Sequence, residues 1–529
     1  MKYLLVLLST FALLTACGGS KSGGGIGRPP GGGGSGWQQG VFLDANTFYA
    51  QCQSPRNGID PATGNAFSDV AGTILDENNF LRSLSDEIYL WYNEIVDQDP
   101  GLFNDPLTYF DQLRTMATTS SGAAKDKFHF TYDSEEWFQL SQGGVSAGYG
   151  MEFKILSQFP PREIAIVYTE PNSPAGAVGL KRGARILEID GVDIDTTVSA
   201  EINILNAGLN PAANGETHDF VVLDLGAAAS RSLTMTTADF SNAMVQNLDV
   251  INLPSGRVGY MTFNFHRAPA EEELINAINF LNSGQGIDDL VLDIRYNGGG
   301  FLDIAAELAY MIAGPVPTAG RTFEMLQFND KHPVTNPVTG NPIVPTLFHD
   351  ATQGFGTLPE GQALPTLGLS RVYVLTGGST CSASEAIMNG LRGVDVEVIQ
   401  IGSTTCGKPY GFYAIDNCGT TYFTVQFRGV NEKNFGDYTD GFSPANTGAG
   451  AGEPVPGCSV GDDLDHWLGD PAEARLAAAL AHRDGIGCPA PSGLGPLDGL
   501  SKAGFASAAD DIVLQRSLWD SNRILRPQP

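Results

Sequence analysis

The chain has 529 residues, which is enough for several domains of ordinary size. Hydrophobic residues make up 42% of the chain, so most of it can bury cores, and the formal net charge is −29. This charge argues against nucleic acid as a partner, because phosphate binding needs clustered lysine and arginine. An acidic surface mainly serves solubility and repels strongly acidic substrates.

The N-terminus has the pattern of an export signal. Residues 1–17, MKYLLVLLSTFALLTAC, contain one lysine, a short apolar stretch and small residues before Cys17. The apolar stretch is too short to span a membrane, so the pattern predicts a signal peptide. The ending Leu-Thr-Ala-Cys resembles a bacterial lipobox, which implies lipidation at Cys17; an ordinary secretory peptide is the alternative. Gly18 follows rather than Asp, so we expect a chain lipid-anchored in the bacterial cell envelope, at the outer membrane facing the periplasm. Residues 18–40 are Gly-rich and predict a flexible linker.

Residues 41–140 carry helical periodicity. In the stretch FLRSLSDEIYLWYNEI, apolar residues recur at spacings of three and four, at Leu81, Leu84, Ile88 and Trp91. This pattern predicts a helical N-terminal domain, and we interpret its aromatic residues as core.

Residues 141–238 alternate strand-like runs with glycine turns, as in GVSAGYGMEFKIL and EIAIVYTE. The segment resembles a PDZ domain. The resemblance implies that the loop formed by Gly148, Tyr149, Gly150 and Met151 holds the C-terminus of a peptide, while the following strand pairs with that peptide. The alternative is that the two glycines only make a turn.

The stretch from 239 to 485 alternates strands and helices, which predicts an α/β domain. An apolar run at 372–375 predicts a strand, followed by a Ser-rich turn and a helix from about Ala383. A second strand at 396–401 leads into a loop that carries Lys408. If these strands are neighbours in one parallel sheet, both loops open at its carboxyl edge, where α/β sheets place their chemistry. Residues 315–366 are rich in Pro, Gly and Thr and predict an insertion near this edge, a lid or a substrate guide.

Ser382 and Lys408 are candidates for nucleophilic catalysis. A serine hydroxyl needs a base, and a lysine can act as one when desolvation lowers its pKa toward the neutral form. The helix start that follows Ser382 offers backbone N–H groups for an oxyanion. The structural alternative is a capping box, because Ser382-Ala383-Ser384-Glu385 can satisfy the first turn of a helix. Ser384 is a second candidate hydroxyl.

Three motifs in this order resemble the C-terminal processing peptidases, the S41-type serine proteases with a Ser-Lys dyad. The family's D-L-R-x-N-P-G-G pattern appears at residues 293–300 as DIRYNGGG, its S-A-S-E pattern at 382–385, and its G-K pattern at 407–408. The resemblance covers roughly residues 70–480. It implies a multidomain α/β protein: a catalytic domain with the crotonase-like spiral fold, an inserted PDZ-like β domain and the N-terminal helical domain.

The resemblance also implies the roles of the site residues. Ser382 would be the nucleophile and Lys408 the base, with the oxyanion held by the backbone N–H of Ala383 and one from Gly299 or Gly300. Asp293 and Arg295 are expected to position the turn. No metal or organic cofactor is expected, and the implied partners are polypeptides recognised through their C-termini.

This sequence departs from the family pattern at two positions. Many relatives carry a glutamine four residues after the lysine, where this chain has Phe412, and Gly298 replaces the proline of the Gly-rich turn. The third catalytic residue therefore stays open; for Glu385 we favour a helix cap over a role in orienting Lys408.

Two rival functions remain at this level. One is a catalytically silent lipoprotein scaffold that binds peptide tails, although scaffolding would require neither the serine nor the lysine. The other is a Ser-His-Asp hydrolase, but no recognisable triad motif surrounds any of the seven histidines, and we interpret His266 as structural.

Six further cysteines lie in this exported chain, at 52, 381, 406, 418, 458 and 488. An even number in an exported chain fits up to three disulfides. Cys406 and Cys418 are candidates to pair across a turn, Cys458 and Cys488 flank a helix, and a bridge from Cys381 would pin the turn beside Ser382. Residues 462–482 predict a short Asp-capped helix. The tail at 486–529 has little pattern, although we expect Ile512, Leu514 and Leu518 to dock on the surface.

Overall fold

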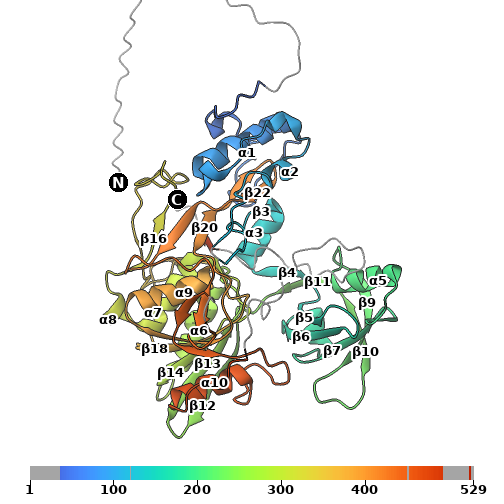
Figure 1. Ribbon diagram of the computed structural model, residues 1–529, viewed down its shortest axis with the longest axis vertical. Helices are drawn as coiled ribbons and strands as arrows, with labels where there is room; N and C mark the ends of the chain where they lie inside the picture. The colour runs from blue at the N-terminus through green and yellow to red at the C-terminus, as the bar shows by residue number, and fades with distance from the viewer. Residues whose placement is uncertain (1–35, 120, 449–451, 493–522, 526–529) are drawn as a thin grey trace, which may run out of the picture.

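The computed structural model describes residues 36–119, 121–448, 452–492 and 523–525 (Figure 1). The predicted signal peptide, Cys17 and most of the linker lie outside these residues, as do Ile512, Leu514 and Leu518. None of the helices within the described part of the chain has the length and apolar character that crossing a bilayer requires.

The N-terminal region is built around one amphipathic helix, α1 (Ile74–Ile88). Thr73 and Asp76 form a capping box at its start, and Phe80, Leu81 and Leu84 are buried along one face. The prediction of helix was correct here but incomplete, because short strands accompany the helices. The other elements are η1 (Ala45–Thr47), β1 (Gln51–Cys52), β2 (Val70–Ala71), η2 (Tyr92–Glu94), η3 (Pro100–Leu102), α2 (Pro106–Phe110), β3 (Phe130–Asp133) and α3 (Ser134–Gly143).

A small β unit follows, drawn in green apart from the main body in Figure 1. Its strands pair in the order β10-β9-β7-β6-β5, so β5 is an edge strand. The chain enters through β4 (Val145–Gly148) and leaves through β11 (Ala238–Ser241), and these two strands pair antiparallel as a two-stranded connection. The unit contains β5 (Met151–Ser157), β6 (Glu163–Thr169), α4 (Pro174–Ala177), β7 (Arg185–Ile189), β8 (Val192–Asp193), α5 (Ser199–Leu209), β9 (Thr217–Leu223) and β10 (Arg231–Thr236).

The main body contains a six-stranded sheet in the order β12-β13-β14-β18-β19-β26. Every neighbouring pair from β13 to β26 is parallel, and β12 is antiparallel. The strands are β12 (Val245–Leu253), β13 (Gly256–Phe263), β14 (Asp289–Asp293), β18 (Arg371–Thr376), β19 (Glu397–Gly402) and β26 (Gly457–Ser459). The two strands predicted at 372–375 and 396–401 are therefore neighbours with their carboxyl ends at one edge, which confirms the premise of the sequence argument.

Alternation of side chains along these strands separates two cores. Leu292 and Val374 face α6 (Ala270–Leu281), α7 (Leu302–Ala313) and α9 (Ala383–Gly393). Val291 and Tyr373, one position away, face α10 (Ala474–Arg483) on the other side. The N-cap of α10 is Glu473, whose carboxylate accepts from the N–H of Leu476 at 2.9 Å, so the predicted aspartate cap was wrong.

A second six-stranded sheet has the order β15-β27-β20-β23-β16-β17. It combines β15 (Gly300–Phe301), β16 (Thr322–Gln327), β17 (Thr346–Leu347), β20 (Tyr410–Tyr413), β23 (Phe427–Val430) and β27 (Arg523–Leu525). The remaining elements are α8 (Pro315–Thr318), β21 (Ile415–Asn417), β22 (Thr420–Phe423), β24 (Phe442–Pro444) and β25 (Glu453–Val455). Strand β27 comes from the tail, where the sequence predicted no regular element.

Three disulfides connect distant parts of the chain. Cys52 pairs with Cys418 and joins the N-terminal region to the turn between β21 and β22. Cys458 pairs with Cys488 on either side of α10, and Cys381 pairs with Cys406. The suggested pairing of Cys406 with Cys418 was therefore wrong. The bridge from Cys381 does pin the turn beside Ser382, as expected.

The predicted insertion at 315–366 is fixed to two helices through buried carboxylates. The N–H of Gln353 donates to Glu271 of α6 at 2.5 Å and to Glu307 of α7 at 3.1 Å, and the N–H of Phe355 donates to Glu271 at 2.8 Å. Burial, together with the adjacent Glu271 carboxylate, raises the pKa of Glu307 to about 10. One proton is therefore held between two buried acids at neutral pH.

We expect Glu307→Gln to stabilise the protein at pH 8 by up to about 5 kcal/mol and to have little effect near pH 4. The folded chain keeps a proton that the unfolded chain loses above its ordinary pKa of 4.5, so wild-type stability falls as pH rises toward the folded pKa of about 10. The amide mimics the protonated acid without this penalty. Thermal unfolding between pH 4 and 9 measures the difference, with Glu272→Gln on the exposed face of α6 as control. Parallel pH profiles for Glu307→Gln and wild type would contradict the shared proton.

Candidate active site

Ser382 lies at the junction of β18 and α9, as the N-cap of the helix. Its backbone has φ 61° and ψ −112°, a conformation that costs a non-glycine residue about 1–3 kcal/mol and is found most often at functional sites. The turn before it is held by Thr380, whose hydroxyl donates to the carbonyl of Ile294 at 2.8 Å. Ser382 is completely buried.

Lys408 lies on the loop after β19, two residues before β20, and is also completely buried. Its Nζ lies 4.6 Å from the ring centroid of Phe128 and 4.5 Å from that of Phe412. Phe412 occupies the position where many relatives of the resembling family have a glutamine, so an aromatic ring lies beside Lys408 in place of a side-chain amide. Gly407 is needed for the turn, because its φ is 78° and a Cβ would lie 2.2 Å from the carbonyl oxygen of Thr439.

Glu385 joins the serine loop to the lysine loop. One carboxylate oxygen, Oε2, accepts from the backbone N–H of Ser382 at 2.9 Å and from that of Lys408 at 2.8 Å. The other, Oε1, accepts from the N–H of Gly407 at 2.9 Å and from the hydroxyl of Thr405 at 2.5 Å. The interpretation of Glu385 as a cap was incomplete, since the same carboxylate also fixes the lysine loop.

A covalent bond reinforces this connection. Cys381, directly before Ser382, is disulfide-bonded to Cys406, two residues before Lys408. The N–H of Cys406 also donates to the carbonyl of Thr380 at 3.0 Å. The two candidate residues therefore belong to one cross-linked unit at the carboxyl edge of the sheet.

The Gly-rich turn packs against the serine loop through Asn297. Its carbonyl accepts from the N–H of Cys381 at 3.2 Å and from the hydroxyl of Ser384 at 3.0 Å. Its side-chain oxygen accepts from the N–H of Gly299 at 2.9 Å, so this predicted oxyanion donor is already engaged. The hydroxyl of Ser384 is likewise engaged in holding the turn.

Gly300 is the other predicted donor in this turn. Its φ is 135°, and a Cβ would meet the carbonyl oxygen of His266 at 2.3 Å, so the position requires glycine. The carbonyl of Gly299 accepts from the N–H of His266 at 3.2 Å, and the N–H of Phe301 donates to the carbonyl of His266 at 2.9 Å. Because backbone groups alternate in direction along a strand, the N–H of Gly300 points to the opposite side, toward β27.

His266 contacts the Gly-rich turn through both its ring and its backbone. The ring is completely buried, and its Nδ1 lies 3.0 Å from the side-chain oxygen of Asn297. Burial lowers the pKa of His266 to about 3, so the ring is neutral and donates to Asn297. This contact supports the interpretation of His266 as a structural residue.

The N-terminal region completes the wall of the site, which the sequence did not indicate. Besides Phe128, it supplies Lys127, whose Nζ donates to the carbonyl of Cys406 at 3.0 Å. Burial lowers the pKa of Lys127, and the carboxylates of Glu385 and Asp440 oppose that shift. Trp91 packs edge-on against Tyr410 of β20, and their ring centroids lie 4.8 Å apart. No local pattern marks these residues, because their contacts span about three hundred positions in sequence.

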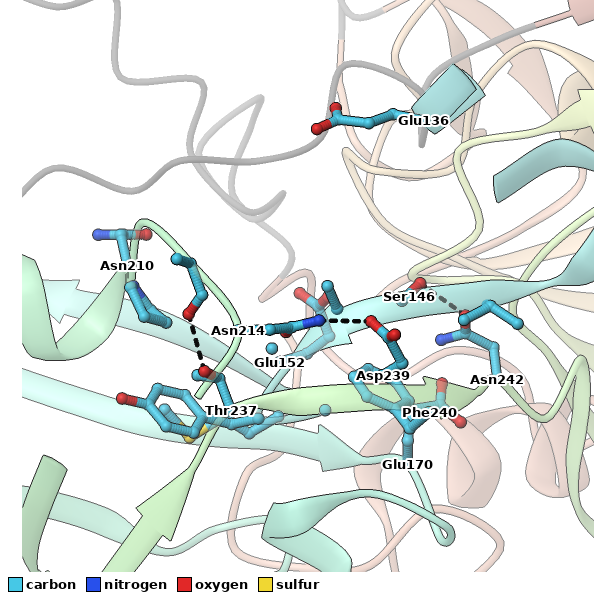
Figure 2. Close-up of a pocket in the computed structure, with 18 of the residues that line it drawn as sticks. Glu136, Ser146, Glu152, Glu170, Asn210, Asn214, Thr237, Asp239, Phe240 and Asn242 are labelled. Atoms are coloured by element: carbon cyan, nitrogen blue, oxygen red, sulfur yellow. Dashed lines mark hydrogen bonds between the residues drawn. The ribbon is translucent and has the colours of Figure 1, made fainter. Parts of the chain in front are cut away.

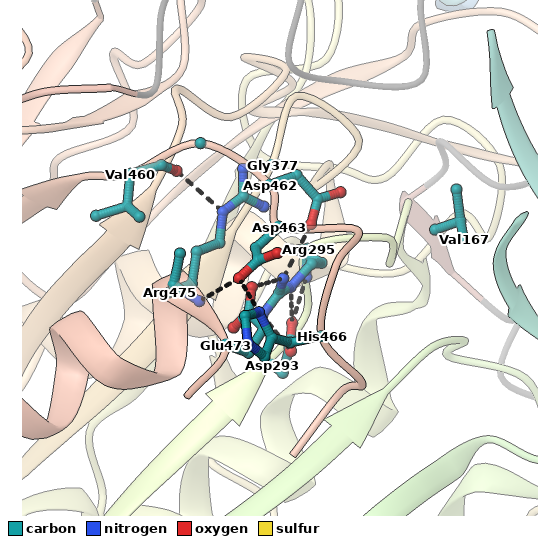
Figure 3. A network of polar contacts seen from close by, with 12 residues as sticks. Val167, Asp293, Arg295, Gly377, Val460, Asp462, Asp463, His466, Glu473 and Arg475 are labelled. Atoms are coloured by element: carbon teal, nitrogen blue, oxygen red, sulfur yellow. Dashed lines mark hydrogen bonds and ion pairs between the residues drawn. The ribbon is translucent and has the colours of Figure 1, made fainter. Parts of the chain in front are cut away.

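A buried ionic network surrounds Arg295, which directly precedes the Gly-rich turn (Figure 3). Arg295 binds Asp293 at 2.9 Å and Glu473 at 2.7 Å, so both predicted positioning residues belong to this network. Arg295 also binds Asp462 at 3.0 Å. Burial alone would raise the pKa of Asp462, but nearby arginines, Arg182 first, hold it well below its usual value.

Arg182 connects the small β unit to this network. Its guanidinium donates to the hydroxyl of Tyr296 at 2.7 Å and to Asp462 at 2.8 Å. It also donates to the carbonyls of Val167 and His466, at 2.9 and 3.0 Å. Tyr296 directly precedes Asn297, so the contact reaches the Gly-rich turn through one residue.

The predicted peptide-binding loop lines a cavity of about 640 Å³ (Figure 2). Gly148, Tyr149, Gly150 and Met151 all contribute to its wall, and Gly148 and Gly150 have φ of 133° and 71°. Acidic side chains gather around it, from α3, β5, β11 and the loop after β6: Glu136, Glu152, Asp239 and Glu170. Burial raises the pKa of Glu170 to about 7.

Comparison with known proteins adds the following similarities. The sequence model described as peptidase family S41 matches residues 257–412. A carboxyl-terminal-processing protease of Picosynechococcus is 28% identical over 286 residues, which are 52% of this chain and 59% of that protein. A protein of the same description from Synechocystis is 28% identical over 171 residues, 32% of this chain and 38% of that protein. The chain thus spans less than two thirds of the length of these curated relatives.

A solved structure supports the fold. A crystal structure from Bacteroides fragilis described as an S41 protease aligns with a TM-score of 0.57 and 22% identity, over 77% of this chain and 97% of that one. At this identity the likeness shows a shared multidomain α/β fold.

Proposed function

Residues 257–412 belong to peptidase family S41, and from this and the site geometry we propose that the chain is a serine endopeptidase of the Ser-Lys type, acting on exported polypeptides. The observation that carries the proposal is the cross-linked unit of Ser382, Glu385 and Lys408. One carboxylate oxygen accepts from the backbone N–H of both Ser382 and Lys408, within 2.9 Å. The Cys381–Cys406 disulfide fixes the same two loops.

In the proposed mechanism, Lys408 in its neutral form takes the proton from the hydroxyl of Ser382, which attacks the scissile carbonyl carbon. Complete burial favours the uncharged amine over the ammonium. The N–H groups of Ala383, at the start of α9, and Gly300 receive the oxyanion. Lys408 then returns the proton to the leaving amine, and water hydrolyses the acyl-enzyme with Lys408 again as base.

The fold proposed for the catalytic domain is the crotonase-like spiral, and the small β unit is proposed as PDZ-like. Its edge strand β5 follows the Gly148–Met151 loop directly and lies along the cavity. A substrate tail would add to this edge, with its terminal carboxylate at the loop's N–H groups. The acidic surroundings favour tails with basic side chains upstream of the terminus.

We further propose that the chain is lipid-anchored through Cys17 in the bacterial envelope, at the outer membrane facing the periplasm. The lipobox-like sequence supports this, together with three disulfides, which form in oxidising compartments. Metabolic labelling with a radioactive fatty acid, compared between wild type and Cys17→Ser, would test it. Equal labelling of the two would rule out anchorage at Cys17.

Acyl-enzyme trapping tests the peptidase proposal. A peptide ester is mixed with the enzyme, the reaction is quenched in acid, and the digested protein is mapped by mass spectrometry. We expect the acyl group on Ser382, and cleavage of an unfolded protein that depends on its C-terminal residues. Turnover with the adduct on Ser384 or on any other residue would overturn the assignment, and so would a failure to cleave any tail tested.

We expect Arg182→Lys to lower kcat for peptide cleavage about tenfold while leaving the Kd for a tail peptide unchanged. A lysine cannot bind Tyr296, Asp462 and two carbonyls at once, so the support of the Gly-rich turn by the small β unit weakens. Arg185→Lys is the matched control, because Arg185 lies in the same unit and forms its ion pairs, with Glu163 and Asp465, at the surface rather than in the buried network. An unchanged kcat in Arg182→Lys would show that the contact only holds the two units together.

A further inference from the structure

The last described segment of the chain, Arg523–Leu525, forms strand β27 between two strands of the active-site edge. On one side, Arg523 and Ile524 pair with Gly300 and Phe301 of β15. On the other, Ile524 and Leu525 pair with Phe412 and Tyr413 of β20. Both pairings are parallel. The tail is therefore the single strand that lies between β15 and β20.

This position adjoins the catalytic groups. β15 starts at Gly300, whose N–H points toward β27, and β20 starts two residues after Lys408. Neighbouring strands lie about 4.8 Å apart, so the backbone at Arg523 lies directly beside a donor assigned to the oxyanion. An extended substrate near Ser382 would need the same strand edges that the tail now covers.

The direction of β27 distinguishes it from a bound acyl segment. β27 runs parallel to β15 and β20, away from the Gly-rich turn. A substrate segment on the acyl side of the scissile bond runs toward the nucleophile, so in this position it would be antiparallel to both strands. The tail therefore covers the groove in the reverse direction and presents no acyl-side bond to Ser382.

The composition of the tail suits such a strand. The last seven residues, RILRPQP, contain two arginines and no acidic residue, in a chain of net charge −29. Two apolar residues, Ile524 and Leu525, give the segment strand propensity. A tethered segment meets its own site at an effective concentration of about millimolar, so even weak pairing fills the groove.

We propose that the C-terminal segment is an intramolecular competitive inhibitor, which occupies the groove between β15 and β20 until a substrate displaces it. This inference rests on the proposed peptidase function and names its regulation. Because the tail competes with substrate and leaves Ser382, Glu385 and Lys408 in place, it raises KM and leaves kcat unchanged.

The test compares the full chain with one that ends at Asn522. We expect removal of the last seven residues to lower KM for a peptide substrate about tenfold with kcat unchanged. The synthetic peptide RILRPQP should inhibit the shortened enzyme competitively, and a peptide of shuffled sequence should not. Equal KM values for the two enzymes, or inhibition that is not competitive, would overturn the proposal.

Point variants guard against effects of truncation on folding. Ile524→Pro removes an N–H from a strand flanked on both sides and should reproduce the low KM. Gln528→Ala, beyond the strand, should keep the KM of the full chain. If Ile524→Pro also keeps the KM of the full chain, the strand does not compete with substrate.

A binding measurement separates this proposal from the peptidase proposal. Fluorescent RILRPQP is titrated with the Ser382→Ala chain that ends at Asn522, and its anisotropy is recorded. Saturable binding to this chain, with none to the Ser382→Ala full chain, supports the tail site even if no substrate is ever cleaved. Equal binding to both chains, or to neither, overturns the tail site and leaves the peptidase proposal standing.

Discussion

Replacing Lys408 by methionine is expected to lower kcat/KM for peptide cleavage by about 10⁴-fold or more, down to the rate left by Ser382→Ala. Methionine keeps the buried volume between Phe128 and Phe412 but cannot take a proton. The double variant should be no slower than either single one, because the two residues act as a unit. Initial rates with a tail-bearing peptide measure this loss.

Lys127→Met is the matched control for this experiment. Lys127 is partly buried beside the site, its pKa is lowered by burial, and its Nζ donates to the carbonyl of Cys406. It is thus the other lysine near the lysine loop that could act as a base. We expect at most a tenfold loss, since its contact is with the backbone of the cross-linked unit. If Lys127→Met abolished cleavage and Lys408→Met did not, the assignment of the base would be wrong.

The stability of Lys408→Met separates chemistry from folding. An apolar side chain of similar length in a completely buried site should leave the Tm unchanged or higher, because no amine then has to be kept out of water. A large fall in Tm would mean that the amine holds the site together, and the loss of activity would then say little about proton transfer.

Local sequence patterns were sufficient to predict the frame of the site. The apolar run at 372–375 and the Ser-rich turn that leads into a helix from about Ala383 predicted β18 and α9, and the run at 396–401 predicted β19. These patterns work because burial on both faces of a parallel strand leaves a continuous apolar run. The same patterns placed Ser382 and Lys408 at one edge of the sheet.

Contacts between distant segments could not be predicted in this way. Phe128 and Lys127 reach the site from the N-terminal region, and Cys52 pairs with Cys418 across 366 positions. Strand β27 has three residues, too few to show a period. Its pairing depends on the two edges that receive it, and those edges are formed by other parts of the chain.

Glu385 shows that a recognised motif can predict one contact of a side chain and miss its others. The sequence S-x-x-E is correctly read as a capping box, because the carboxylate does accept from the N–H of Ser382. Nothing in that motif indicates that three further donors, from Thr405, Gly407 and Lys408, converge on the same carboxylate. A motif specifies the local bond and leaves the remaining lone pairs of the acceptor unassigned.

We therefore expect Glu385→Gln to lower kcat by about 10²–10³-fold with little change in the Kd for a tail peptide. Each carboxylate oxygen accepts two donors, so an amide nitrogen at either position would face two N–H or O–H groups that it cannot accept from. The disulfide still ties the loops, so the fold should survive while the two catalytic residues lose their alignment. Single-turnover rates and tail binding would be measured on the same preparation.

Glu397→Gln, an exposed glutamate at the start of β19, is the matched control and should keep full activity. A second comparison uses Thr405→Val, which removes one donor to Glu385 and should cost about tenfold, less than the glutamine variant. If Glu385→Gln and Glu397→Gln were equally active, the carboxylate would be only a helix cap. The alignment of Ser382 and Lys408 would then depend on the Cys381–Cys406 bridge, and reduction of that bridge would have to lower kcat to the level expected here for the glutamine variant.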